Sequence, residues 1–351
     1  MVCIALAGCS GGEGSGAANP DNSGPTLGPA ELAILVAEGD TTGESIARAY
    51  QRARGVPDAN VIRVRVPATG DEIAATDFAT LKATIDARLP GTVQATLLTW
   101  TAPSRVVGTC TMSITSALAL GFDAQWCANT CETTAPTAYF ASASRRPFTD
   151  FGIRPSMMLG LGTLAEAQAL IDRGVSADGI VTSGRAMGTG WLVRTNDVAR
   201  SVRWPDFRTL ASQPVSGVVL NYLDNSSGTG SNAVANQNNV LFYFTGLATV
   251  PQIGTNSWLP GAAADHLTSY GGHLPLGLGQ MPSTDWLRAG ATASYGTVAE
   301  PCNITDKFPR ASTLVGRYQA GDTLLEAYWK SVRTPGQGLF VGEPLARPWA
   351  R

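Results

Sequence analysis

Charged residues are scarce in this chain. Asp, Glu, Lys and Arg make up 15% of the 351 residues, and the formal net charge is −2. Binding to nucleic acid depends on many cations that neutralise phosphates, and no basic run occurs, so we expect no nucleic-acid partner. Hydrophobic residues reach 44%, which is enough for a large core, and we expect disorder only near the ends.

Motifs that announce a cofactor or a metal are also absent. The sequence has no Gly-Lys-Ser/Thr of a P-loop and no His-Glu-x-x-His of a zinc protease. The segment GLGTLA at residues 160–165 lacks the last glycine of the dinucleotide-binding fingerprint. We therefore expect no bound cofactor and no resident metal.

The N-terminus resembles the end of a bacterial lipoprotein signal. Residues 6–9 read Leu-Ala-Gly-Cys, which fits a lipobox in which Cys9 is lipidated. The apolar stretch before Cys9 is too short to span a bilayer and lacks basic residues, so we interpret residues 1–9 as a truncated signal. Ser10 then favours the outer membrane. Residues 10–29 predict a flexible tether, and residues 30–351 a single large α/β domain. A chance apolar start is the alternative.

Export decides how the remaining cysteines are interpreted. An oxidising compartment favours two disulfides, whereas a four-cysteine zinc site would need two closely spaced pairs. We expect a local bridge, Cys127–Cys131, and a long-range bridge, Cys110–Cys302, since each partner of the latter follows a predicted strand. The alternatives pair Cys110 with Cys127 or Cys131 and leave the remaining cysteine for Cys302.

Strand-like and helix-like segments alternate along the chain, which predicts a three-layer α/β sandwich with a mostly parallel sheet. Helices are predicted at residues 43–57, 76–90, 113–122, 163–179 and 323–332. Strands are predicted at residues 32–39, 60–67, 93–100, 179–184, 215–225, 239–250, 290–301 and 338–349.

Both histidines lie in one stretch, WLPGAAADHLTSYGGH, at residues 258–273. The favoured interpretation is structural: a helix begins at Pro260, packs through residues 262–267 and ends in a glycine turn. A metal site built from His266, His273 and Asp265 is one alternative. Another is a nucleophile such as Ser269 with a histidine as its base.

Six segments together resemble an uncharacterised family of exported bacterial proteins, known mainly from genomes that carry the exosortase sorting system. They are YQRARGVPDANVIRV, LTWTAPSRV, MSITSALALGFD, WLPGAAADHLTSYGG, AGATASYGTVAEPC and LLEAYWKSVRTPGQGLFVGEPLARPW. The resemblance covers about residues 31–350 and implies no assigned reaction. It implies a caspase/gingipain-like or Rossmann-like topology. In the caspase-like and gingipain cysteine peptidases one strand ends in His-Gly and the next in a nucleophilic Cys. Here the corresponding positions offer Thr245-Gly246 and Ser269.

We therefore expect a lipid-anchored envelope protein without peptidase activity, acting as a binding or accessory protein in exopolysaccharide- or exosortase-linked surface processes. Its partners would be the membrane and an unidentified envelope protein or polysaccharide. The carboxyl ends of parallel strands are where such sheets bind ligands, so the candidate contacts are Trp100, Arg105, Thr245 and Trp258. The alternative is a hydrolase in which His266 or His273 is the general base, with Ser269 and Asp265 as further candidates.

Overall fold

The computed structural model describes residues 26–68 and 70–350. The lipobox, Cys9 and most of the expected tether lie outside the described residues. Packing begins earlier than the expected domain start at residue 30, because Leu27 is already buried in the core.

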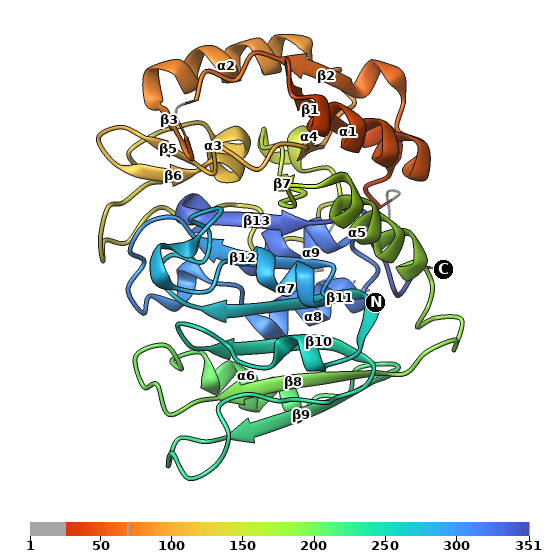
Figure 1. Ribbon diagram of the computed structural model, residues 1–351, viewed down its shortest axis with the longest axis vertical. Coiled ribbons are helices and arrows are strands. Elements are labelled where there is room, and N and C mark those ends of the chain that lie inside the picture. The colour runs from red at the N-terminus through yellow and green to blue at the C-terminus, as the bar shows by residue number, and fades with distance from the viewer. Residues whose placement is uncertain (1–25, 69, 351) are drawn as a thin grey trace, which may run out of the picture.

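The fold is α/β, as expected, with a central sheet of ten strands in the order β2-β1-β4-β7-β13-β12-β11-β10-β8-β9 (Figure 1). The strands are β1 (Leu32–Ala37), β2 (Val61–Val64), β4 (Ala95–Leu98), β7 (Ser156–Met158), β8 (Gly188–Arg194), β9 (Val218–Asp224), β10 (Val240–Gly246), β11 (Trp258–Leu267), β12 (Ala293–Thr297) and β13 (Gly338–Gly342). A small second sheet contains β3 (Glu72–Ala74), β5 (Arg105–Val107) and β6 (Thr111–Ser113).

Helices cover both faces of the large sheet, which makes the sandwich three-layered. Figure 1 shows α5 and α7 in front of the strands, and α8 and α9 behind them. The α-helices are α1 (Thr41–Arg54), α2 (Ala75–Arg88), α3 (Ile114–Leu120), α4 (Pro147–Phe151), α5 (Leu164–Ala177), α6 (Trp204–Ala211), α7 (Thr284–Ala289), α8 (Ala311–Gln319) and α9 (Leu324–Ser331). Short 3₁₀ turns are η1 (Pro29–Glu31), η2 (Asp58–Asn60), η3 (Ile253–Thr255), η4 (Gly277–Gly279), η5 (Thr305–Lys307) and η6 (Pro335–Gln337).

Helix α1 illustrates how local sequence defines an element. The Asp40 side chain accepts a hydrogen bond from the Gly43 backbone N–H and caps the first turn. Ile46 and Tyr50, four residues apart, are buried on one face. The helix ends at Gly55, whose φ of 72° is a left-handed conformation that glycine adopts without a steric penalty.

The sheet consists of two parallel halves that run in opposite directions. Strands β2, β1, β4, β7 and β13 are mutually parallel, as are β12, β11, β10, β8 and β9. The halves meet at the antiparallel pair β12–β13. The strands of one half therefore point toward one end of the sheet, and the strands of the other half point toward the opposite end, so their carboxyl ends lie on opposite sides.

This reversal explains why the expected cysteine pairing is wrong. The bridges are Cys110–Cys127 and Cys131–Cys302, with Cα–Cα distances of 5.7 and 5.2 Å, and this pairing is one of the alternatives left open above. The expected Cys110–Cys302 bridge assumed that β4 and β12 end at one edge, but they belong to opposite halves. Cys110 instead lies in the turn between β5 and β6.

Two disulfides in one chain indicate an extracellular or periplasmic protein, because cytosolic thiols are kept reduced. Within residues 26–68 and 70–350, no helix has the length and apolar character needed to cross a bilayer.

Two predicted elements differ from the structure. Residues 179–184 form turns, and the strand of this region is β8, seven residues long and beginning at Gly188. The expected helix at residues 260–267 is part of strand β11. An interior strand of a sheet covered on both faces is apolar throughout, and such a run cannot be distinguished from a buried helix by periodicity.

Candidate functional site

Strand β11 lies inside the second half of the sheet and carries two of the candidate residues side by side. It pairs with β10 so that Phe244 lies opposite Asp265 and Thr245 opposite His266. Successive residues of a strand point to opposite faces, so Asp265 and His266 enter different layers of the sandwich. Their bonds confirm this, because Asp265 contacts Arg203 beside α6, whereas His266 contacts Trp286 of α7.

His266 is fully buried, and both of its ring nitrogens are occupied. Its Nδ1 accepts a hydrogen bond from Trp286 Nε1 at 2.9 Å, and its Nε2 donates to the Met281 carbonyl at 3.1 Å. The partners define the tautomer, since an indole N–H only donates and a carbonyl only accepts. Burial lowers the pKa of His266 to about 3. The ring is therefore neutral and has no free lone pair with which to act as a base.

Asp265 forms a buried ion pair on the opposite face. Its Oδ1 lies 2.6 Å from Arg203 Nη2, and the two side chains are 1% and 4% exposed. Burial raises the pKa of Asp265, and the charge of Arg203 opposes that shift. Arg203 also donates to the carbonyls of Thr245, at 2.6 Å, and Pro309, at 3.1 Å. This arrangement fastens the ends of β10 and β11 to the segment before α8.

His273 belongs to a separate polar cluster in the loop after β11. Its Nδ1 lies 3.1 Å from Arg105 Nη1 and 3.2 Å from Asp71 Oδ2. Arg105 also pairs with Asp71, and with Glu72 at 2.9 Å. Burial and the charge of Arg105 lower the pKa of His273, while Asp71 and Glu72 raise it. We call these four residues the Arg105–His273 cluster.

The cluster joins two residues that the sequence singled out for different roles, Arg105 as a ligand contact and His273 as a base. Sequence reasoning missed Asp71, which directly precedes β3, and Glu72, which is the first residue of that strand. Their signal is an acidic pair directly after Thr69-Gly70 and before the apolar Ile73. Burial works to raise the pKa of Asp71, but hydrogen bonding and charge from Arg105 lower it, so Asp71 is ionised at neutral pH.

The other sequence candidates do not join one site. Trp100 is buried in the large core, and Trp258 packs edge-on against Trp286, with ring centroids 5.9 Å apart. Thr245 is buried, and its hydroxyl has no hydrogen-bond partner among the described residues. Ser269 is half-buried, and its carbonyl accepts from the Thr297 hydroxyl at 2.9 Å.

The metal interpretation of this stretch is not supported. His266 and Asp265 point to opposite faces, and His273 is held by Arg105, a cation. Across the part of the chain that the structure describes, no group of three His, Cys, Asp or Glu side chains is placed to hold a metal ion.

The residues at the strand ends differ from the catalytic residues of the cysteine peptidases. Strand β10 ends in Thr245-Gly246, where those peptidases have His-Gly. Cys110, Cys127, Cys131 and Cys302 are all in disulfides, so none of these four can supply a thiolate nucleophile.

A cavity lies near the end of β10, where Arg203 donates to the Thr245 carbonyl. Its volume is about 380 Å³, and Arg203, at the start of α6, forms part of its wall. The lining combines rigid apolar surface with hydroxyl and charged groups, and consists of Val202, Arg203, Pro205, Asp206, Thr305, Pro309, Arg310 and Ser312. We call it the Arg203 cavity. Asp206 accepts hydrogen bonds from the Ser312 backbone and hydroxyl, which holds α6 to α8 across its floor.

A comparison of the chain with protein-family models, curated proteins and solved structures finds no match.

Proposed function

We propose that the protein is a lipid-anchored envelope protein that binds a saccharide segment of an envelope polysaccharide at the Arg203 cavity, without cleaving it. The observation that carries the proposal is the cavity itself, which Arg203 connects to the carboxyl end of β10, and parallel strands commonly present their ligand sites at such ends. Its volume of about 380 Å³ lies in the range of small-ligand sites.

The chemistry of the lining favours a ligand rich in hydroxyl groups. Thr305 and Ser312 supply hydroxyls, Arg310 supplies donors, and Pro205 and Pro309 supply flat apolar surface. A few convergent polar groups on an apolar wall orient a neutral or weakly charged ligand. Arg203 is already paired with Asp265, so the cavity contains no buried cation that demands a strong anion.

A binding role also agrees with the state of the residues that catalysis would need. His266 uses both ring nitrogens in hydrogen bonds, and the four cysteines of residues 110–302 are bridged. These groups stabilise the fold, and none of them lines the Arg203 cavity. Asp206, the carboxylate in the lining, already accepts two hydrogen bonds from Ser312.

Two matched arginines test the proposal. Arg310 and Arg333 are both 49% exposed, and both pair with Asp306, but only Arg310 lines the Arg203 cavity. Isothermal titration with oligosaccharides cut from the envelope polysaccharide should show binding to the wild type. Arg310→Ala should weaken that binding about tenfold, the effect of losing about 1.4 kcal/mol. Arg333→Ala should not change it. Absence of wild-type binding, or equal losses in both variants, would refute the assignment.

The anchoring part of the proposal has its own test, which uses the gene with its complete signal sequence. The protein should partition with membranes, and Cys9→Ala should release it into the soluble fraction. A Cys9→Ala protein that stays membrane-bound would contradict lipidation at this residue.

A hydrolase that uses His273 is the second candidate, and the contact of His273 Nδ1 with Asp71 at 3.2 Å favours it. If Nδ1 donates to Asp71, the Nε2 lone pair is available as a base. If Nδ1 accepts from Arg105, Nε2 carries the proton and cannot act in this way. A fluorophosphonate probe distinguishes the two functions. Labelling that disappears in both Ser269→Ala and His273→Gln supports the hydrolase, and no labelling supports binding.

A further inference from the structure

A second cavity lies beside the C-terminal end of α8, whereas Ser312 of the Arg203 cavity lies near the start of that helix. Its volume is about 420 Å³, and its lining is polar and carries two arginines, Arg145 and Arg347. The complete lining is Thr26, Arg145, Gln319, Ala320, Gly321, Arg347, Trp349 and Ala350. We call it the Arg347 cavity. No carboxylate is among these residues, so an anion that enters meets positive charge without a competing acidic wall.

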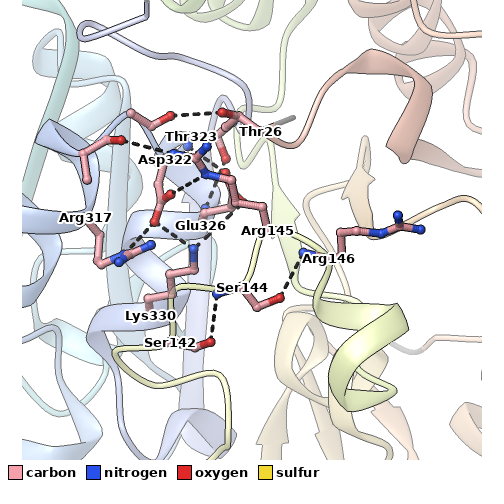
Figure 2. Close-up of polar contacts among 12 residues, drawn as sticks. Thr26, Ser142, Ser144, Arg145, Arg146, Arg317, Asp322, Thr323, Glu326 and Lys330 are labelled. Atoms are coloured by element: carbon pink, nitrogen blue, oxygen red, sulfur yellow. Dashed lines mark hydrogen bonds and ion pairs between the residues drawn. The ribbon is translucent and has the colours of Figure 1, made fainter. Parts of the chain in front are cut away.

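The positive charge extends into the protein behind Arg145. Asp322 is fully buried and accepts from three cations: Lys330 at 2.7 Å, Arg317 at 2.8 Å and Arg145 at 3.3 Å (Figure 2). One carboxylate therefore serves three cationic side chains. Because charges in a partly buried site are weakly screened, this cluster makes the floor of the cavity electropositive.

The second buried carboxylate of the cluster compensates little. Glu326 lies 4.0 Å from Lys330, and its Oε2 accepts from the Thr323 backbone N–H at 2.8 Å in a capping box. Burial raises the pKa of Glu326, which reduces the negative charge that it carries, and burial also lowers the pKa of the neighbouring Lys330 ammonium.

The side chains of Arg347 and Arg145 differ in their contacts with the rest of the protein. The Arg347 backbone N–H donates to Asp178, while its guanidinium makes no hydrogen bond or ion pair with another described residue. Arg145 is positioned by Asp322 and by the Ala320 carbonyl, to which Nη2 donates at 3.1 Å. Trp349 forms a rigid wall, because its indole donates to the Ser216 carbonyl and stacks on Phe242.

We propose that the Arg347 cavity binds a small molecule through a carboxylate or phosphate group held by the guanidinium of Arg347, with the charge of Arg145 beside it. The planar guanidinium presents paired N–H donors that match two oxygens of either group. The volume of about 420 Å³ accommodates a ligand of sugar-acid or sugar-phosphate size and excludes a folded protein segment. This proposal is independent of saccharide binding at the Arg203 cavity.

Two probes identify which oxyanion the site prefers. Inorganic phosphate and glucuronate are titrated separately into the full chain at constant ionic strength, with chloride as the reference salt. Binding is measured by calorimetry and by the rise in Tm, since a ligand of the native state stabilises it. Tighter binding of phosphate assigns a phosphorylated ligand, and tighter binding of glucuronate assigns a carboxylate.

Variants of Arg347 connect the binding to this cavity. Arg347→Gln should weaken binding of the preferred probe at least tenfold. Arg347→Lys keeps the positive charge but loses the paired N–H donors of the guanidinium, so its affinity should lie between those of Arg347→Gln and the wild type. Arg52→Gln, which replaces an exposed arginine in α1 outside the cavity, should bind as the wild type does. The proposal is overturned if neither probe binds better than chloride, or if Arg347→Gln and Arg347→Lys bind as tightly as wild type.

Discussion

His266 and His273 are seven residues apart, yet they have opposite surroundings. His266 lies in a central strand, bound by Trp286 and the Met281 carbonyl, with burial holding its pKa near 3. His273 lies in a loop beside Arg105 and Asp71, half-buried, with a pKa that is lowered to a lesser extent. The same side chain is a neutral structural element in one position and a titratable group in the other. Burial and partners therefore distinguish the two histidines better than their spacing does.

The largest expected effect is the loss of the His266 side chain. His266→Ala leaves the Trp286 N–H and the Met281 carbonyl unpaired and opens a cavity in the core, at a cost of about 3–5 kcal/mol in the free energy of unfolding. His273→Ala removes a partly exposed ring and should cost about 1 kcal/mol or less. Urea denaturation of both variants measures the difference. Equal losses would contradict the assignment of different roles.

A smaller effect that distinguishes the two histidines is the dependence of stability on pH. In the unfolded chain His266 has a pKa near 6.5, and in the folded state its pKa is about 3. The unfolded state therefore binds the proton first, so stability falls as pH drops below about 6.5. The loss between pH 7 and pH 5 should be about 2 kcal/mol.

His266→Gln should remove this part of the acid sensitivity. His273→Gln serves as the control and should retain it. Denaturation of the two variants at pH 7 and pH 5 gives the comparison. A His266→Gln protein whose stability falls with pH as steeply as that of the wild type would show that another group causes the acid loss.

The smallest effect concerns the ring of His273. Arg105→Ala removes the cation beside Nδ1 and opens the site to water, while Asp71 remains. The pKa of His273 should rise as a result, because both burial and the charge of Arg105 lower it in the wild type. Nuclear magnetic resonance follows the ring protons between pH 4 and pH 8. The ring of His266 should not titrate in that window, and a pKa of His273 that stays constant would indicate that Arg105 does not influence the ring.

The segments that became β1, α1, β2, α2 and β4 could be predicted from the sequence because their signals are local. The run Leu32–Ala37, the cap at Asp40 and the left-handed Gly55 each define an element boundary without help from distant residues. Strand β11 could not be predicted in this way. Ala262–Ala264 are apolar on both faces because both faces are covered, and such a run suits a buried helix equally well.

Only some residues of the candidate site could be predicted from the sequence. Arg105 and His273 were named from the sequence, but their contact depends on a small sheet that brings β5 next to the loop after β11. The cysteine pairing failed for a similar reason, because strand direction in the second half depends on the antiparallel β12–β13 contact. Long-range pairing of this kind leaves no mark in a single segment of sequence.

The Cys131–Cys302 bridge closes a covalent ring over 171 positions of the chain, and the ring includes every strand from β7 to β12. A single backbone cut within this ring, for example in the exposed loop at residues 226–231, would leave the two pieces joined as one molecule. A single proteolytic cut between Cys131 and Cys302 therefore nicks this protein without dividing it. Both the Arg203 cavity and the Arg105–His273 cluster draw residues from inside the ring and from outside it. The bridge thus keeps the parts of each site tethered for as long as the environment stays oxidising.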